Sequence, residues 1–471
     1  MGLVSFGLPL VLLSLLAVTP GEADLRRIPV SSNAACTQAL LPEGLGFQER
    51  MLRNISPQGA ARGAVIASPS TSDPNYFYHW IRDGALTMDV VVRLWEHENE
   101  PGRRTVLFQY IWDYLVFSRQ NQLTVTLTGL GEPKYEADGR AFDGEWGRPQ
   151  NDGPALRAVT AARVALASMA QGRRDLADQL YRAEMPARTL IKNDLEYVAH
   201  HWRDASVDLW EEVTGDHYYT RLAQLRALRI GSVLARELGD VPAARFYTEQ
   251  AEAIAASLDG FWDPAARRLK ATVNRVRGVD YKHSELDAAV VLAALHAGAD
   301  GERGGVDDDR LLATIPVLEL AFTQAYPING VIPHLPPAIG RYPEDRYYGG
   351  NPWILTTAAM AEHAFRLVVA LRHKDIELNE TNGVFWHAVA PGLPMRSRII
   401  AGSAEHTQVL AGLQQRGEGY LARVSRHMPE DGRLDEQWDR TTGFQASARD
   451  LTWSYASLVT ALLWRDAALT K

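Results

Sequence analysis

The stretch Arg-Asp-Leu-Thr-Trp-Ser-Tyr-Ala-Ser-Leu-Val-Thr-Ala, residues 449–461, decides the fold class. It opens with charged and aromatic residues, whereas residues 456–461 are small or apolar on every side of a helix. A helix that is apolar nearly all round is buried. Residues 358–361, Ala-Ala-Met-Ala, repeat this pattern after another polar, aromatic loop. The sequence therefore predicts buried helices whose N-terminal loops carry the polar chemistry.

The rest of the chain is overwhelmingly helical in pattern. Apolar residues recur at spacings of three and four, as in Leu222, Leu225 and Leu238. Two of the predicted helices have sequences typical of helix N-caps at their starts. Asn351 precedes Pro352, and the residues from Ser447 to Asp450 resemble a capping box. We expect about twelve helices, which begin near Leu45, Asp83, Arg103, Gly153, Asp175, Asp216, Pro242, Glu285, Asp308, Pro352, Ala404 and Ala448.

The segments alternate in character. Loops before the second, fourth, sixth, tenth and twelfth helices are rich in Trp, Tyr, Arg and carboxylates, whereas those before odd-numbered helices are plain turns. An all-α ring of inner helices inside a ring of outer helices explains this, because all inner N-termini then open on one rim. The alternative is an irregular helical bundle with unrelated loops.

Five loops share a composition that suits sugar binding. Trp and Tyr offer flat apolar surface for the C–H faces of a pyranose, while Arg and Asp supply fixed donors and acceptors for its hydroxyls. The loops cover residues 76–83, 146–154, 208–212, 340–353 and 434–453.

Glycoside hydrolysis needs two carboxyl groups with different roles. Glu211 is our candidate for the acid, because Asp208, Glu212 and Trp210 beside it would favour the protonated form. Glu436 lies among polar and charged residues and is our candidate for a base that remains ionised. An adjacent Glu pair is also a common feature of solvated surfaces.

Other classes find little support in the composition. The chain has 471 residues, 46% of them hydrophobic, and a net charge of −8 without a long basic cluster, so a nucleic-acid partner is not expected. We find no phosphate-binding glycine loop, no Gly-x-Ser-x-Gly elbow and no His-Glu-x-x-His motif. We expect no metal and no cofactor.

The N-terminus resembles a secretory signal peptide, residues 1–23. Residues 3–18 are apolar but too few for a membrane span, and small residues follow at 21–23. A short pro-segment to residue 27 is consistent with Arg26-Arg27, and a buried N-terminal helix is the alternative. Cys36 is the single cysteine, so no internal disulfide forms. Asn54 and Asn379 stand in glycosylation tripeptides.

Taken together, these loops resemble the glucoamylases of glycoside hydrolase family 15, especially those of fungi. The resemblance covers roughly residues 40 to 466 and rests on long motifs in the same order. They are residues 67–71, 76–83, 147–150, 208–212, 341–345 and 447–455.

This resemblance implies an (α/α)6 toroid and inverting release of β-glucose from α-1,4 and, more slowly, α-1,6 linkages. It assigns Glu211 as general acid and Glu436 as general base. The first subsite would be lined by Tyr76, Trp80, Arg82, Asp83, Arg341 and Trp453. The pocket wall or the next subsite would take Trp146, Asp208, Trp210, Glu212, Tyr347 and Trp353.

The expected protein is a secreted, extracellular monomer with one catalytic domain, residues 28–471, and no starch-binding domain. Its expected partners are starch, dextrins and malto-oligosaccharides, with weak action on raw granules and no membrane partner. Asp435 departs from the common pattern, in which an uncharged residue precedes the base. Open alternatives are a trehalose- or dextran-cleaving enzyme of the same fold, a non-catalytic carbohydrate-binding domain, and a toroid that processes isoprenoids or proteins.

Overall fold

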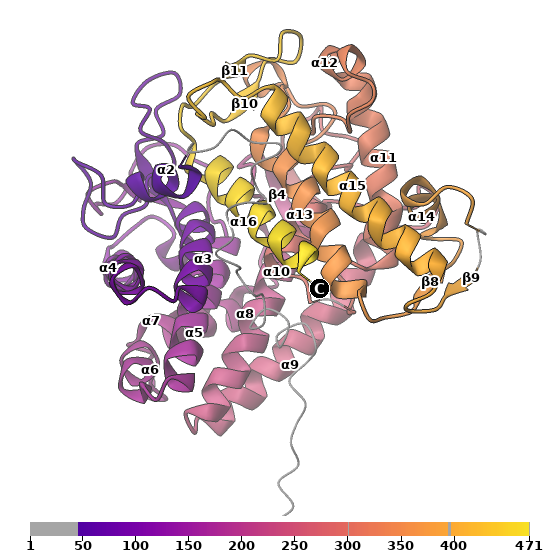
Figure 1. The fold of residues 1–471 in the computed structure, drawn as a ribbon. Helices are drawn as coiled ribbons and strands as arrows, with labels where there is room; N and C mark the ends of the chain where they lie inside the picture. Colours follow the sequence, from indigo (N-terminus) through magenta and orange to yellow (C-terminus); the bar gives the residue numbers. More distant parts are fainter. Residues whose placement is uncertain (1–45, 300, 394–396, 471) are drawn as a thin grey trace, which may run out of the picture.

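Two concentric sets of helices form the body of the computed structural model, which describes residues 46–299, 301–393 and 397–470 (Figure 1). The signal-peptide, pro-segment and Cys36 predictions fall outside the described residues. The inner helices are α3 (Ile81–His97), α5 (Asp152–Ala170), α8 (Tyr218–Glu237), α10 (Ala289–Ala297), α13 (Ile354–Leu371) and α16 (Thr452–Leu469). The outer helices are α2 (Phe47–Arg53), α4 (Pro101–Leu123), α7 (Leu190–His201), α9 (Val241–Ser257), α11 (Asp309–Ala325) and α15 (Ala404–Arg426).

The inner helices form a closed ring. Each of them packs against the next in chain order, and α16 returns to pack against α3. Outer helices pack on the ring from outside, for example α9 on α8 and α15 on α13. In Figure 1 the late helix α16 accordingly lies between α13 and the first part of the chain. The predicted all-α ring is confirmed.

Burial follows the predicted alternation. Every side chain of α13 is buried except Val369, whereas α15 buries only one stripe. In the described part of the chain α13 alone is long and apolar enough to cross a bilayer, and 94% of that stretch is covered by protein. Its composition therefore reflects its place in the ring.

Three short helices and small strand pairs decorate this frame. The helices are α6 (Arg174–Leu180), α12 (Pro327–Val331) and α14 (Gly383–Val389). The antiparallel sheets are β1 (Tyr78–Trp80) with β2 (Lys134–Glu136); β3 (Ser206–Val207), β4 (Val213–His217) and β7 (Thr272–Gly278); β5 (Trp262–Asp263) with β6 (Arg268–Leu269); β8 (Ile376–Leu378) with β9 (Ser397–Ile399); and β10 (Gln437–Trp438) with β11 (Gln445–Ala446).

The helix predicted to begin near Asp175 is present as the seven-residue α6. The outer helix of this pair is α7, which begins at Leu190 and was not predicted. Buried Lys192 and Asp194 interrupt the apolar period of α7, because they pair with Asp240 and Arg157 on other helices.

Both predicted caps are wrong. The helices start later, with Trp353 and Leu451 at the N-cap positions. Asn351 instead bonds Gln437 across 3.1 Å, and the hydroxyl of Ser447 donates to Glu436.

None of the six inner helices has a side-chain cap, whereas outer helices α4, α9, α11 and α15 do. At the N-termini of several inner helices, the backbone N–H groups instead donate hydrogen bonds to backbone carbonyl groups of other loops. Ile81 donates to Pro133 (2.9 Å), Ile354 to Glu436 (3.2 Å) and Thr452 to Ala67 (2.8 Å). The rim of the ring is thus joined by main-chain bonds between distant segments, which satisfies the free N–H groups of the helix ends.

One predicted glycosylation site is contradicted. Asn54 is buried, and its side-chain amide donates to the carbonyl of Asp450 (3.0 Å) and to the hydroxyl of Thr452 (2.8 Å). Its nitrogen is therefore not free to carry a glycan.

Candidate active site

A cavity of about 550 Å³ opens at the rim where the inner helices begin. This is within the usual size range of small-ligand sites. Five loops supply its lining, those before α3, α5, α8, α13 and α16. Thirteen of the fourteen predicted site residues line it, namely Tyr76, Trp80, Arg82, Asp83, Trp146, Trp210, Glu211, Glu212, Arg341, Tyr347, Trp353, Glu436 and Trp453.

Asp208 is the exception and lies behind the lining. Its side chain accepts hydrogen bonds from the backbone N–H groups of Glu212 (2.8 Å) and Val213 (2.9 Å). Its backbone carbonyl accepts a hydrogen bond from the backbone N–H group of Glu211 (2.9 Å). Glu211 itself has a positive φ of 69°. Such a conformation persists where surrounding structure holds it. Asp208 therefore shapes the turn that points Glu211 into the cavity.

Glu211 is held by neutral donors. Its Oε1 accepts from Trp80 Nε1 at 2.8 Å and from Gln150 Nε2 at 2.9 Å, while the Arg82 guanidinium lies 3.8 Å away. The like-charge surroundings expected from sequence are absent, because Asp208 and Glu212 are each paired with a cation. Lys282 lies 3.4 Å from Asp208, and Arg341 lies 2.8 Å from Glu212.

Glu436 occupies a far more buried position, with 1% of its surface exposed. Its backbone N–H bonds the carbonyl of Ala448 (2.9 Å), which extends the β10–β11 pairing and brings Ser447 alongside. The Ser447 hydroxyl donates to Oε2, and Gln437 Nε2 lies 3.2 Å from the same oxygen.

Burial raises the pKa of Glu436 to about 7, although hydrogen bonds from Ser447 and Tyr76 act in the opposite direction. This differs from the expectation that Glu436 stays ionised, because desolvation of the carboxylate outweighs its donors. Asp435 is not the cause. It faces away, bonds Arg433 at 2.9 Å, and accepts from the backbone of Asp450 at 3.1 Å.

Arginines with fixed partners stand on both sides of the cavity. Arg82 bonds Gln150 (2.9 Å) and Asp152 (3.1 Å), and Arg341 bonds both oxygens of Asp345 (2.8 and 2.5 Å). Burial raises the pKa of Asp83 to about 6, although Arg82 acts in the opposite direction. These groups are rigid donors and acceptors at the floor of the site.

Aromatic rings form two walls. Trp80 lies between Tyr76 and Trp146, with ring centroids 5.4 and 5.9 Å apart. In the second wall, Trp210 contacts Trp353 (5.6 Å) and Trp453 (6.3 Å). A hydrogen bond of 2.6 Å between the Tyr76 and Tyr347 hydroxyls connects the walls. Both walls offer apolar surface on which a pyranose ring can stack.

Sequence reasoning missed several supporting residues. Lys134 on β2 places its ammonium 3.4 Å from the centroid of Trp146 and 4.6 Å from that of Trp80, and burial lowers its pKa to about 8. Asp287 accepts from Trp210 Nε1 at 2.9 Å. Both residues stand outside the five loops that the composition singled out. Gln150 and Ser447 lay inside quoted motifs, but no pattern indicated that they contact the carboxyl pair.

Comparison with known proteins agrees with this site. The family model described as glycosyl hydrolases family 15 matches residues 47–463. A glucoamylase of Blastobotrys adeninivorans is 36% identical over 434 residues, which cover 88% of this chain and 69% of that protein.

Two solved structures are similar throughout. A family 15 glucoamylase from Hypocrea jecorina matches with a TM-score of 0.81 and 32% identity, covering 89% of this chain and 70% of that one. The glucoamylase of Saccharomycopsis fibuligera also gives 0.81, at 30% identity, with 90% and 94% covered. With its closed double ring and five-loop cavity, this chain belongs to glycoside hydrolase family 15.

Proposed function

We propose that the chain hydrolyses terminal α-1,4 and, more slowly, α-1,6 glucosidic bonds at the non-reducing ends of starch, dextrins and malto-oligosaccharides. It acts from chain ends with inversion and releases β-D-glucose. The observation that carries this proposal is that Glu211 and Glu436 line one cavity between two aromatic walls. The names of the similar proteins, all glucoamylases, support the same activity.

Glu211 acts as general acid and donates a proton to the leaving glycosidic oxygen. Glu436 acts as general base and activates a water on the opposite face of the sugar. An inverting enzyme separates its two carboxyl groups by about 6.5–9.5 Å to make room for that water, against roughly 5–5.5 Å in a retaining enzyme. The hydroxyl of Tyr76, which bonds Glu436, would help to place that water.

The pair must hold one proton in total, and catalysis requires it on Glu211. Burial favours the protonated form of Glu436. A substrate hydroxyl and the attacking water would donate hydrogen bonds to Glu436 and thereby favour its ionised form. We therefore expect substrate binding to favour the ionised form of Glu436 that the role of base requires.

Arg82, Asp83 and Arg341 bind the hydroxyls of the terminal glucose, and the aromatic walls stack on its faces. The next glucose unit contacts Trp146 and the outer part of the wall that contains Tyr347. Asp208 contributes through the turn that it holds. Each role is a proposal that rests on the position of the side chain in the cavity.

Proton NMR of fresh product from maltotriose tests the reaction most directly. We expect β-glucose to appear first and to mutarotate afterwards, with maltose as the other initial product. Initial release of α-glucose, or of a larger sugar from the chain interior, would contradict the proposal. Parallel measurements with isomaltose and trehalose distinguish it from a same-fold enzyme with another linkage preference.

We further propose that the chain is secreted as a monomer and carries a glycan at Asn379. Residues 3–23 support secretion. Asn379 is partly exposed, but its side-chain nitrogen bonds Asp309 at 2.7 Å, a bond that glycosylation must replace. Mass spectrometry of secreted protein tests the mature N-terminus and the glycan together.

A further inference from the structure

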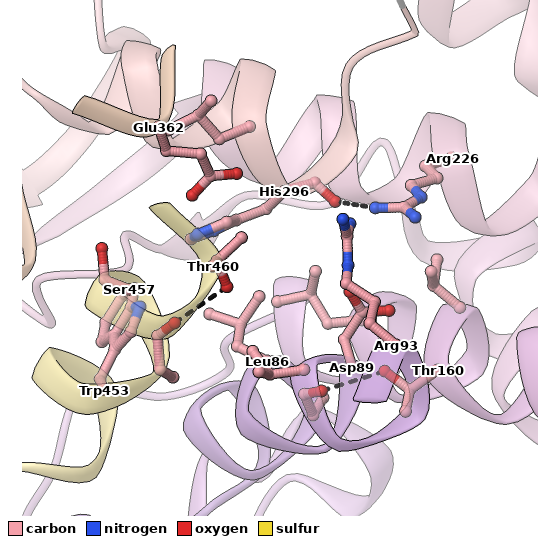
Figure 2. A pocket seen from close by; sticks show the side chains of 16 residues that line it. Leu86, Asp89, Arg93, Thr160, Arg226, His296, Glu362, Trp453, Ser457 and Thr460 are labelled. Atoms are coloured by element: carbon pink, nitrogen blue, oxygen red, sulfur yellow. Dashed lines mark hydrogen bonds and ion pairs between the residues drawn. The ribbon is translucent and has the colours of Figure 1, made fainter. Parts of the chain in front are cut away.

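A second cavity lies on the axis of the ring beneath the active site. This floor chamber measures about 40 Å³ and is lined by side chains from all six inner helices (Figure 2). One water needs roughly 10–15 Å³ of such volume, so the chamber has room for a small guest. Trp453 lines both cavities and separates them.

One end of the floor chamber is rich in positive charge. Asp89 is paired with both Arg93 (3.2 Å) and Arg163, and Arg163 also bonds Glu96 (2.6 Å). The guanidinium of Arg226 donates to the backbone oxygen of His296, its only polar contact within the described chain. Figure 2 shows the Arg93 and Arg226 groups converging beside that oxygen. Three guanidinium groups therefore share two carboxylates, and one positive charge has no counter-ion there.

Glu362 faces the chamber from α13 (Figure 2). Only 4% of its surface is exposed, and its carboxyl group has no hydrogen-bond or ion-pair partner among residues 46–299, 301–393 and 397–470. Burial raises its pKa to about 7, opposed by Arg93 and Arg366 and supported by Asp89. At pH 5 this group is therefore largely neutral and does not balance the arginines.

The remaining polar groups are already committed or neutral. The hydroxyls of Thr160, Ser457 and Thr460 donate to backbone carbonyls at 2.9–3.0 Å. His296 bonds the Tyr219 hydroxyl at 2.9 Å, and burial lowers its pKa to about 3. The free donors facing the chamber are thus mainly the N–H groups of Arg93 and Arg226.

We propose that the floor chamber binds one small monoatomic anion of the chloride class between Arg93 and Arg226. Arg226 is only partly exposed and has no ion-pair partner among the described residues, and an anion supplies both the charge and the acceptor that the arginines lack. A cation would face the same guanidinium groups and is disfavoured by them, and the chamber of about 40 Å³ limits the guest to a few atoms. When Glu362 ionises, its own carboxylate becomes the counter-ion and the external anion is released.

Thermal unfolding of the full chain tests this proposal. Sodium chloride and sodium bromide should raise Tm saturably at pH 5 relative to sodium isethionate at equal ionic strength, and this difference should vanish at pH 8.5. Equal shifts for chloride and isethionate at pH 5 would mean that the chamber holds water alone and would overturn the proposal.

Variants separate the two partners. Arg226→Gln should abolish the chloride-specific shift at pH 5, whereas Glu362→Gln should retain it even at pH 8.5, because the amide cannot ionise. Arg229→Gln is the matched control, since Arg229 lies one turn further along α8, is 41% exposed at its side chain and pairs with Glu302. A chloride-specific shift that persists in Arg226→Gln refutes the site.

A crystallographic readout does not depend on the folding of any variant. Crystals of the unsubstituted chain soaked in sodium bromide at pH 5 should show an anomalous peak between Arg93 and Arg226. No peak there at saturating bromide would overturn the proposal.

Discussion

Replacement of Ser447 by alanine should move the acid limb of the pH profile to higher pH. The Ser447 hydroxyl donates a hydrogen bond to Glu436 Oε2, and this bond lowers the pKa of the proposed base. A donor to a carboxylate stabilises the charged form, so its removal raises that pKa. Because the base must be ionised to activate water, activity is then lost at low pH first.

The size of the shift follows from the strength of one such bond. A hydrogen bond to a charged group contributes about 1.5–3 kcal/mol, and one pKa unit corresponds to about 1.4 kcal/mol. The full loss would shift the limb by about 1–2 units. Since Tyr76 and Gln437 still bond Glu436 in the variant, we expect a shift of about 1 unit.

The assay is kcat/KM for maltose between pH 3 and 8, for the unsubstituted chain and for Ser447→Ala. Ser232→Ala serves as the control, because its hydroxyl bonds the carbonyl of Ala244 on the outer helix α9, outside both cavities. The expected result is a displaced acid limb with a largely preserved plateau. An acid limb that stays in place, or moves to lower pH, would refute the assignment of that limb to Glu436.

Three other outcomes are expected. Glu211→Gln should lower kcat for maltose by about 10²–10⁴-fold, the usual contribution of general acid catalysis, with KM changed only a few-fold. Near-normal turnover would show that Glu211 is not the general acid. Glu237→Gln, at the far end of α8, is the control. The contribution of Glu362 to folding stability should fall as pH rises from 5 to 8, because burial raises its pKa to about 7, whereas an unfolded glutamate titrates near 4.5. The folded carboxyl group binds more protons in this window, so its contribution decreases by about 2.5 kcal/mol. In urea unfolding the stability of Glu362→Gln relative to the unsubstituted chain should therefore rise from pH 5 to 8, and a constant difference would contradict this. Arg157→Met should cost about 3–5 kcal/mol, because it leaves Asp194 buried without the guanidinium that now bonds it at 2.7 and 2.8 Å. The double variant with Asp194→Leu should recover most of that loss, and a double variant no more stable than the single one would argue against the charge as the cause.

The architecture of the ring could be predicted from sequence because the inner helices are buried on every side and therefore carry small or apolar residues on every side. Residues 358–361 and 456–461 lie on α13 and α16, which pack against each other inside the ring. The pattern failed at α7, where Lys192 and Asp194 are buried but charged. Their partners Asp240 and Arg157 lie on other helices, and no local period reports a contact of that kind.

Helix starts failed for a related reason. A residue such as Ser447 has the composition of a cap, but its hydroxyl bonds the Glu436 carboxylate, and the helix begins five residues later. Local preferences that the tertiary structure overrides are expected at functional sites. The error in the cap prediction therefore coincides with a residue of the active site.

The cavity lining could be predicted from composition, whereas its support could not. Loops crowded with Trp, Tyr and Arg converge on the cavity, as expected from their places before the inner helices. Asp208 was assigned to the lining, but it holds the Glu211 turn from behind. Lys134 and Asp287 act through contacts that form only when β2 and the loop before α10 are folded against the walls.

The main-chain bonds of the rim determine when the rim can first close during translation. The hydroxyl of Thr452 bonds the carbonyl of Ile66 across 386 residues, and the backbone of Thr452 bonds Ala67 beside it. Glu436 and Trp453 belong to the same last segment. During synthesis from the N-terminus, the rim around Ile66 therefore cannot close before Thr452 has been made.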